Sequence, residues 1–120
     1  RGRDPENPFV WVTLAYLHSA LGNHELAVEA YQAAIRLKPD FAEAYGGLGA
    51  VYIPMCRPAE AVEAFKTAIR LKPDYAEAYY GLGAAYLGLG KRAEALRACE
   101  ALQRLDPAEA EELRALIDGR

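Results

Sequence analysis

Apolar residues, and one histidine, recur at helical spacing in six segments of this chain. In each segment they stand about three, four and seven residues apart, which places them on one face of a helix. The six sets are Trp11, Leu14, Ala15 and His18; Ala27, Tyr31, Ala34 and Ile35; Tyr45, Leu48, Gly49 and Tyr52; Ala61, Phe65, Ala68 and Ile69; Tyr79, Leu82, Gly83 and Tyr86; and Ala95, Cys99, Leu102 and Leu105. The pattern predicts an all-α protein.

The segments belong to a repeat with a period of 34 residues. Residues 36–45 read RLKPDFAEAY and residues 70–79 read RLKPDYAEAY. A fixed period of this size is typical of stacked helical units, in which each unit packs on its neighbours. With Pro39, Pro73 and Pro107 placed in register, the units run over 8–41, 42–75 and 76–109.

Three kinds of signal mark the predicted helix ends. A capping residue precedes a proline in Asn7-Pro8 and Asp106-Pro107. An Asp followed three residues later by a Glu, the pattern of a capping box, occurs in Asp40–Glu43 and Asp74–Glu77. Gly22 and Gly90 stand where a left-handed residue would end the first helix of a unit.

The residues at fixed places in each unit resemble the tetratricopeptide repeat (TPR) family. Unit two carries the pattern in Tyr45, Leu48, Gly49, Tyr52, Ala61, Phe65, Ala68 and Pro73. Unit three carries it in Tyr79, Leu82, Gly83, Tyr86, Ala95 and Pro107, and unit one in Trp11, Leu14, Ala27, Tyr31, Ala34 and Pro39. The resemblance implies a right-handed α-solenoid of three antiparallel helix pairs. Small residues such as Ala61 are expected where two helices cross closely.

The C-terminal tail carries Ala110, Leu113, Leu116 and Ile117 on one predicted helix face. We expect a capping helix at about 107–118, because the last unit of a stack needs a cover with a polar outer side. The first helix of a fourth repeat is the alternative. Residues 1–120 are then one domain; because the chain begins with Arg1, we expect an excised or processed piece.

The turn inside unit two departs from the other units. It reads Pro54-Met55-Cys56-Arg57-Pro58. Proline inside a helix removes a backbone hydrogen bond, so the first helix should end near Ile53. Two interpretations remain open for this turn: a tolerated variation, or a widened turn that presents Met55 and Cys56 to a partner. Cys56 should be the more accessible thiol, since Cys99 takes a core position.

Composition and charge exclude several classes of function. The net charge is −3 with both signs interspersed, which gives no basic stripe for nucleic acid. No apolar run is long enough to span a membrane. Cys56, Cys99, His18 and His24 lack zinc-site spacing. We expect free thiols, no metal, no cofactor and a cytoplasmic location, although a removed signal peptide would leave no trace.

No catalytic motif is present, so we expect no enzyme. Gly46-Gly47-x-Gly49 lies inside a predicted helix and is no phosphate loop. The helical glycines cost about 1 kcal/mol each relative to alanine. Something should therefore pack close to them: a neighbouring helix at Gly49, and the backbone of a ligand at Gly46 and Gly47.

The TPR resemblance implies that the first helix of each pair lines a concave groove. The candidate binding residues are Phe9, Val12, Thr13, Tyr16, Gly46, Gly47, Ala50, Ile53, Tyr80, Ala84 and Leu87. Family members that hold the C-terminal carboxylate of heat-shock chaperones use Lys, Arg and Asn at such positions, and none is present here. An apolar or mixed protein segment suits this groove better.

Two functions follow for this fold. The first is a protein-interaction scaffold that binds a peptide or protein segment in the groove. The alternative is self-association through the groove or the end faces, with residues 4–9 as a candidate guest in a second copy. A carrier of a small hydrophobic ligand is a remote third.

Overall fold

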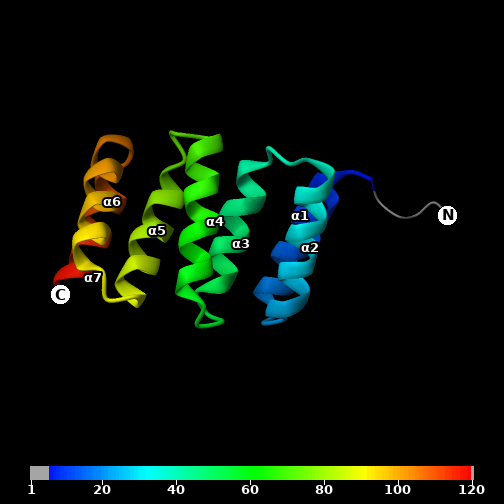
Figure 1. Ribbon diagram of the computed structural model, residues 1–120, viewed down its shortest axis with the longest axis horizontal. Coiled ribbons are helices and arrows are strands. Elements are labelled where there is room, and N and C mark those ends of the chain that lie inside the picture. The colour runs from blue at the N-terminus through cyan, green and yellow to red at the C-terminus, as the bar shows by residue number, and fades with distance from the viewer. Residues whose placement is uncertain (1–5, 120) are drawn as a thin grey trace.

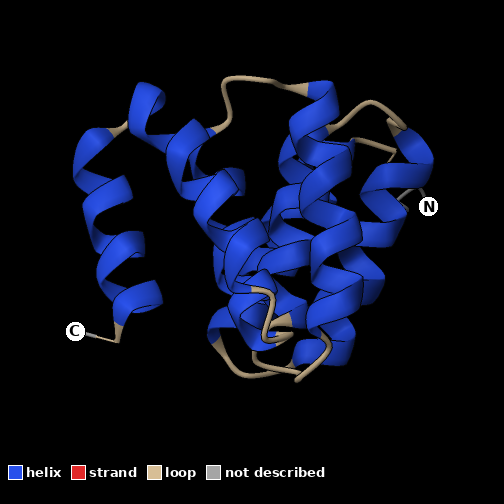
Figure 2. Ribbon diagram, turned by 60° about the vertical axis from the view of Figure 1, so that its left-hand side comes forward, coloured by secondary structure: helices blue, strands red, loops and turns tan. Residues whose placement is uncertain are grey.

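The computed structural model describes residues 6–119, and this part of the chain contains seven helices and no strand. The helices are α1 (Pro8–Ala20), α2 (His24–Leu37), α3 (Ala42–Tyr52), α4 (Pro58–Leu71), α5 (Ala76–Gly88), α6 (Arg92–Leu105) and α7 (Pro107–Asp118). They stand side by side in a row that measures 52 × 26 × 21 Å (Figure 1). Short loops join the helices at both edges of the row (Figure 2).

Each helix packs mainly on its neighbours in the chain. The pairs α1–α2, α3–α4 and α5–α6 make the most extensive contacts, and α3 and α5 also contact each other across successive pairs. The fold is therefore an all-α solenoid of helix pairs. The helix α7 packs on both α6 and α5, so it covers the last pair.

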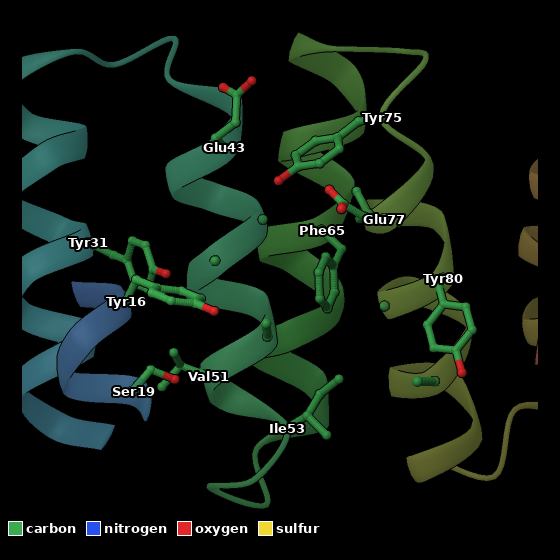
Figure 3. A pocket seen from close by; sticks show the side chains of 16 residues that line it. Tyr16, Ser19, Tyr31, Glu43, Val51, Ile53, Phe65, Tyr75, Glu77 and Tyr80 are labelled. Carbon is green, nitrogen blue, oxygen red and sulfur yellow. The ribbon is translucent and has the colours of Figure 1, made fainter. Parts of the chain in front are cut away.

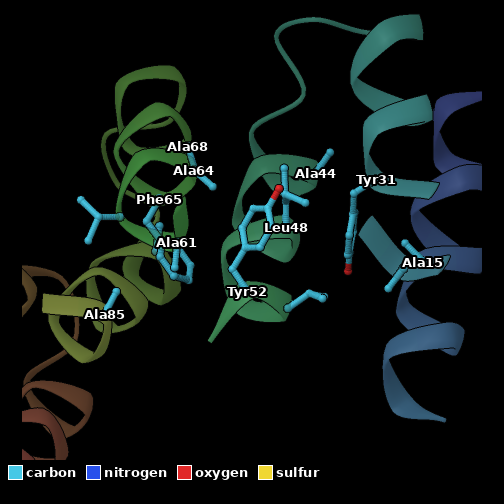
Figure 4. Packing of buried hydrophobic residues seen from close by; sticks show 14 of the residues in the cluster. Ala15, Tyr31, Ala44, Leu48, Tyr52, Ala61, Ala64, Phe65, Ala68 and Ala85 are labelled. Atoms are coloured by element: carbon cyan, nitrogen blue, oxygen red, sulfur yellow. The ribbon is translucent and has the colours of Figure 1, made fainter. Parts of the chain in front are cut away.

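Small residues bring the paired helices close together. Ala27, Ala61 and Ala95, which stand at the same place in the three units, have no solvent exposure. In Figure 4 such alanines lie among larger side chains, including Tyr31, Leu48 and Phe65. A short side chain lets helix axes approach to the lower end of about 8–10 Å.

A second, smaller core joins the last pair to α7. It consists of Ala95, Cys99, Leu102, Ala110, Leu113 and Ile117. The Cys99 thiol donates to the carbonyl of Ala110 over 3.3 Å, which ties α6 to α7. Three of the four residues predicted for the buried face of α7 are buried, but Leu116 is exposed.

Two predicted caps are present and two are wrong. The Asn7 side chain accepts from the Phe9 amide over 2.9 Å, and the Asp106 side chain accepts from the Glu109 amide over 3.2 Å. At α3 and α5, in contrast, the capping positions are Phe41 and Tyr75, without any side-chain cap.

The two predicted capping boxes fail because each helix begins one residue later than the Asp would require. The Asp40 carboxylate instead accepts from the Lys38 ammonium over 3.0 Å, and this contact lowers the pKa of Asp40. Glu43 pairs with Lys72, at the other end of the same unit, over 3.2 Å. Asp40 and Glu43 thus form ion pairs with lysines instead of capping α3.

The turn after α3 has five residues outside the helices, against three in each of the other two turns, but it closes with the same backbone hydrogen bond. As predicted, the helix stops at Tyr52. Cys56 then takes a left-handed conformation with φ of 62°, the place that Gly22 and Gly90 take in the other units with φ of 82° and 74°. The Arg57 amide donates to the Tyr52 carbonyl over 3.0 Å, as the Asn23 and Lys91 amides do in their own turns.

Both thiols are free, with Cys56 exposed and Cys99 buried, as predicted. Met55 is half-buried and packs against the first core. Of the two residues considered for presentation to a partner, only Cys56 therefore faces solvent. The turn has the same closing hydrogen bond as the other two turns, but its left-handed residue is Cys56 instead of glycine.

Candidate functional site: an apolar groove on the concave face

A groove of about 540 Å³ runs over α1, α3 and α5, the first helices of the three pairs. Its lining is mostly apolar and aromatic, with two carboxylates. The lining residues are Tyr16, Ser19, Tyr31, Glu43, Gly46, Gly47, Ala50, Val51, Ile53, Phe65, Tyr75, Glu77, Ala78, Tyr80, Gly81 and Ala84. In Figure 3 Glu43, Tyr75 and Glu77 lie at one end, and Ser19, Val51 and Ile53 at the other.

Seven predicted binding residues line this groove: Tyr16, Gly46, Gly47, Ala50, Ile53, Tyr80 and Ala84. The structure places the other four elsewhere. Phe9 packs edge-on against Phe41 with ring centroids 4.9 Å apart, and the Thr13 hydroxyl donates to the Phe9 carbonyl over 3.0 Å. Val12 and Leu87 are half-buried against the two cores.

The glycines of the groove accommodate the protein's own rings. A Cβ on Gly47 would overlap the Tyr31 ring, and one on Gly81 would overlap the Phe65 ring. A Cβ on Gly46 would lie 2.6 Å from the Tyr75 hydroxyl oxygen. The close approach that the sequence suggested for a ligand backbone is thus made by internal side chains.

The floor of the groove could not be predicted from the first helices alone, because rings from other segments form part of it. Tyr31 and Phe65 belong to α2 and α4, the second helices of their pairs, and Tyr75 precedes α5. Their rings reach the concave face because Gly47, Gly81 and Gly46 leave room for them. The available signal was the pairing of an aromatic residue in one unit with a glycine 16 residues later, since Tyr31–Gly47 and Phe65–Gly81 share that spacing.

Burial raises the pKa of two tyrosines of the groove, Tyr75 and Tyr31. Burial, together with the nearby carboxylates of Glu77 and Glu43 and the neighbouring Tyr31, raises the pKa of Tyr75 to about 12. Burial also raises the pKa of Tyr31, with Tyr16 as a second cause. Tyr16 itself is 68% exposed, so it stands above the groove floor as a wall.

The described part of the chain offers no sign of other chemistry. Residues 6–119 hold no group of three or more His, Cys, Asp or Glu side chains placed to bind a metal. Within the same range no helix is both long enough and apolar enough to cross a membrane.

Family comparison identifies the repeat. A family described as "TPR repeat" matches residues 15–53 and 59–90, and one described as "Tetratricopeptide repeat" matches residues 76–109. The chain belongs to the tetratricopeptide repeat family. TPR domains in general mediate protein–protein interactions and are not enzymes. A comparison with curated protein sequences gave no significant match.

Solved structures superpose over 88–97% of this chain. The first TPR of Spaghetti (RPAP3) bound to the HSP90 peptide SRMEEVD is 25% identical with a TM-score of 0.88, over 97% of this chain and 94% of the other. The OM64 TPR domain of Arabidopsis is 21% identical with a TM-score of 0.89, over 95% and 96%. MamA is 30% identical with a TM-score of 0.80, and the match covers 88% of this chain but 61% of MamA.

Proposed function

We propose that this TPR domain is a scaffold that binds an apolar or mixed peptide segment of another protein in its concave groove. The observation that carries the proposal is the groove itself: about 540 Å³, open, and lined by aromatic, aliphatic and glycine residues. Apolar pockets with a few polar groups at their edge are typical of peptide and ligand sites. Exposed aromatic residues such as Tyr16 are the usual anchors of such interfaces.

The peptide-bound relative supports a peptide as the guest, but not a peptide of the same charge. The Spaghetti (RPAP3) domain was solved with SRMEEVD, a peptide with three acidic residues near its C-terminus. The groove of the present chain has no Lys, Arg or His among its lining residues and carries Glu43 and Glu77 instead. An acidic guest would therefore meet charges of its own sign here.

The test is selection of peptides from a displayed random library, followed by titration against matched variants. Tyr16→Ala removes an exposed groove wall, and Leu21→Ala removes a side chain that is 75% exposed outside the groove. We expect Kd values near 1 μM, about −8 kcal/mol, for a groove of this size. Tyr16→Ala should weaken binding at least tenfold and Leu21→Ala should not. Equal binding by all three proteins would contradict the proposal.

Tyr80→Ala is a weaker test than Tyr16→Ala. Tyr80 lines the groove but also packs against the second core, so its removal changes stability as well as the surface. Tyr80→Phe keeps the ring and removes only the hydroxyl. Comparison of these two variants separates lost contact area from a lost hydrogen bond.

Self-association is a second candidate because of the surface of α1. Between Pro8 and Ala20 this helix carries no Asp, Glu, Lys or Arg. Along one side it exposes Val10, Leu14 and Leu17, and Leu21 continues the row. Helices that are apolar on all sides are usually covered on all sides. A second copy of the chain would cover this face without burying a charge.

Residues 4–9 are a poor guest for a second copy. Pro8 and Phe9 belong to α1, and Phe9 is held against Phe41; residues 4 and 5 lie outside the described residues. Light scattering over a hundredfold concentration range tests self-association through α1. A mass that rises with concentration, and that Leu17→Glu returns to the monomer value, would support it. A monomer throughout would exclude it.

A further inference from the structure

The groove carries its charge at one end only. Glu43 and Glu77 occupy the same position in successive units, 34 residues apart, and both line the groove near Tyr75 (Figure 3). The lining includes no basic residue. The opposite end is formed by Ser19, Val51 and Ile53, which carry no charge. A guest that fits this groove therefore meets an acidic end and an apolar end.

The two carboxylates differ in their partners. Glu43 pairs with the Lys72 ammonium over 3.2 Å, and that ammonium also lies 4.9 Å from the centre of the Tyr75 ring. Lys72 is thus held at the edge of the groove. No cation among residues 6–119 pairs with Glu77. The charge that faces the groove uncompensated is therefore that of Glu77.

More negative charge lies beyond Glu77, on the side of α7. Burial raises the pKa of Tyr80, and the carboxylates of Glu112 and Glu109 raise it further. Burial raises the pKa of Glu109, and Asp106, Glu77 and Glu112 raise it further because all three repel its charged form. Acids from α5 and α7 are thus gathered beside a groove that offers a guest two tyrosine rings.

We propose that the groove selects a peptide segment in which a basic residue adjoins a short apolar run. The basic side chain would lie at Glu77, between Tyr75 and Tyr80, and the apolar side chains would follow the groove past Gly47 and Ala50 towards Tyr16. This deepens the proposed function and rests on it. The argument is charge complementarity along one continuous surface. An arginine at this place would also lie near aromatic faces, which attract cations.

Three peptides test this inference. Each carries an N-terminal fluorescein, a C-terminal amide and the same apolar run, Leu-Ala-Phe-Ala-Leu, and the run is preceded by two Arg, two Gln or two Glu. Anisotropy titrations use the whole chain at low and at high salt. The variants are Glu77→Gln and, as a matched control of equal charge change, Glu100→Gln, an exposed residue of α6 outside the groove.

We expect the Arg peptide to bind about threefold to fivefold more tightly than the Gln peptide at low salt, and the Glu peptide to bind least. Glu77→Gln should remove the difference between Arg and Gln, and Glu100→Gln should preserve it. A preference for Arg that survives Glu77→Gln would overturn the inference. So would equal binding of all three peptides that Tyr16→Ala abolishes, and in that case the proposed function would stand. Failure of all three peptides to bind at millimolar concentration would overturn both.

Discussion

The ring of Phe65 occupies the space that a side chain on Gly81 would need. The same ring lies 2.9 Å from where a Cβ on Gly49 would stand, so it fits between two glycines from successive first helices. Phe65 is almost fully buried in the first core and also forms part of the groove floor. Stability and the shape of the groove therefore depend on one contact.

Gly81→Ala tests this contact. Alanine favours a helix by about 1 kcal/mol over glycine, but overpacking against a buried ring costs about 1–3 kcal/mol, so we expect a net loss of stability. Urea unfolding measures the change. In a Phe65→Leu background the same substitution should cost less, because the smaller side chain leaves room. An equal cost in both backgrounds would show that the ring is not the obstacle.

The left-handed residue of the second turn gives a stabilising substitution. Cys56 is exposed and has φ of 62°, a conformation that costs a non-glycine residue about 1–2 kcal/mol. Cys56→Gly should raise the free energy of unfolding by about 0.5–1 kcal/mol, since the larger flexibility of glycine offsets part of the gain. Thermal unfolding compares it with Cys56→Ala, which should be neutral. No difference between the two variants would contradict this account.

Two aspartates that precede helix starts should differ in their effect on stability. Asp106 caps α7, and its replacement by alanine should cost about 1 kcal/mol. Asp74 lies one residue before Tyr75, the capping position of α5, and the structure shows no side-chain cap there, so Asp74→Ala should change stability by less than about 0.5 kcal/mol. Chemical denaturation of both variants measures the contrast. Similar losses would mean that Asp74 caps α5 in solution.

The raised pKa of Glu109 predicts that the stability of the protein depends on pH. Its folded-state pKa is raised, first by burial and then by Asp106, Glu77 and Glu112, so its charged form is disfavoured in the folded protein. The stability linked to its proton is fully present below the pKa of the unfolded chain and is lost as the pH rises through the folded value. Glu109→Gln should therefore stabilise the protein at pH 7 and give no advantage at pH 3.

An NMR titration of the Glu109 side chain checks the cause. The pKa of Glu109 should lie above 4.5, and Glu112→Gln should lower it, because one repelling charge is removed. A pKa that does not move in that variant would show that Glu112 does not repel the charged form of Glu109. The stability comparison of Glu109→Gln at the two pH values remains an independent measurement.

The sequence was sufficient for the family and the all-helical fold because those depend on periodicity. Apolar spacing and the Asn7 and Asp106 caps are local signals, and each is present in the structure. The capping boxes predicted at Asp40 and Asp74 are wrong because a capping box requires the Asp directly before the first helical residue. Each helix begins one residue too late for that. Phe41 and Tyr75 take the capping positions instead.

The first helices alone do not predict the part of the groove floor that other segments form. The family pattern indicates which faces of the first helices look into the groove, and Tyr16, Gly47 and Ala50 do line it. It does not indicate that a ring from a second helix passes a glycine and reaches the same surface. That result depends on the crossing of α2 with α3 and of α4 with α5, and its signal is a pairing between successive units, Tyr31 with Gly47 and Phe65 with Gly81, which the pattern of a single unit does not contain.

The helix α7 supplies a large side chain that the third unit lacks at the position of Tyr31 and Phe65. Cys99 stands where units one and two have Tyr31 and Phe65, and the space against Gly83 is filled by Leu113 of α7, whose side chain lies 2.6 Å from where a Cβ on Gly83 would stand. Units of this protein are therefore not interchangeable. A duplicated second unit would reproduce its own ring-and-glycine contacts and lengthen the array, whereas a duplicated third unit would set a thiol against glycine and leave a void. The side chains at the junctions between units therefore determine the order in which the units can follow one another.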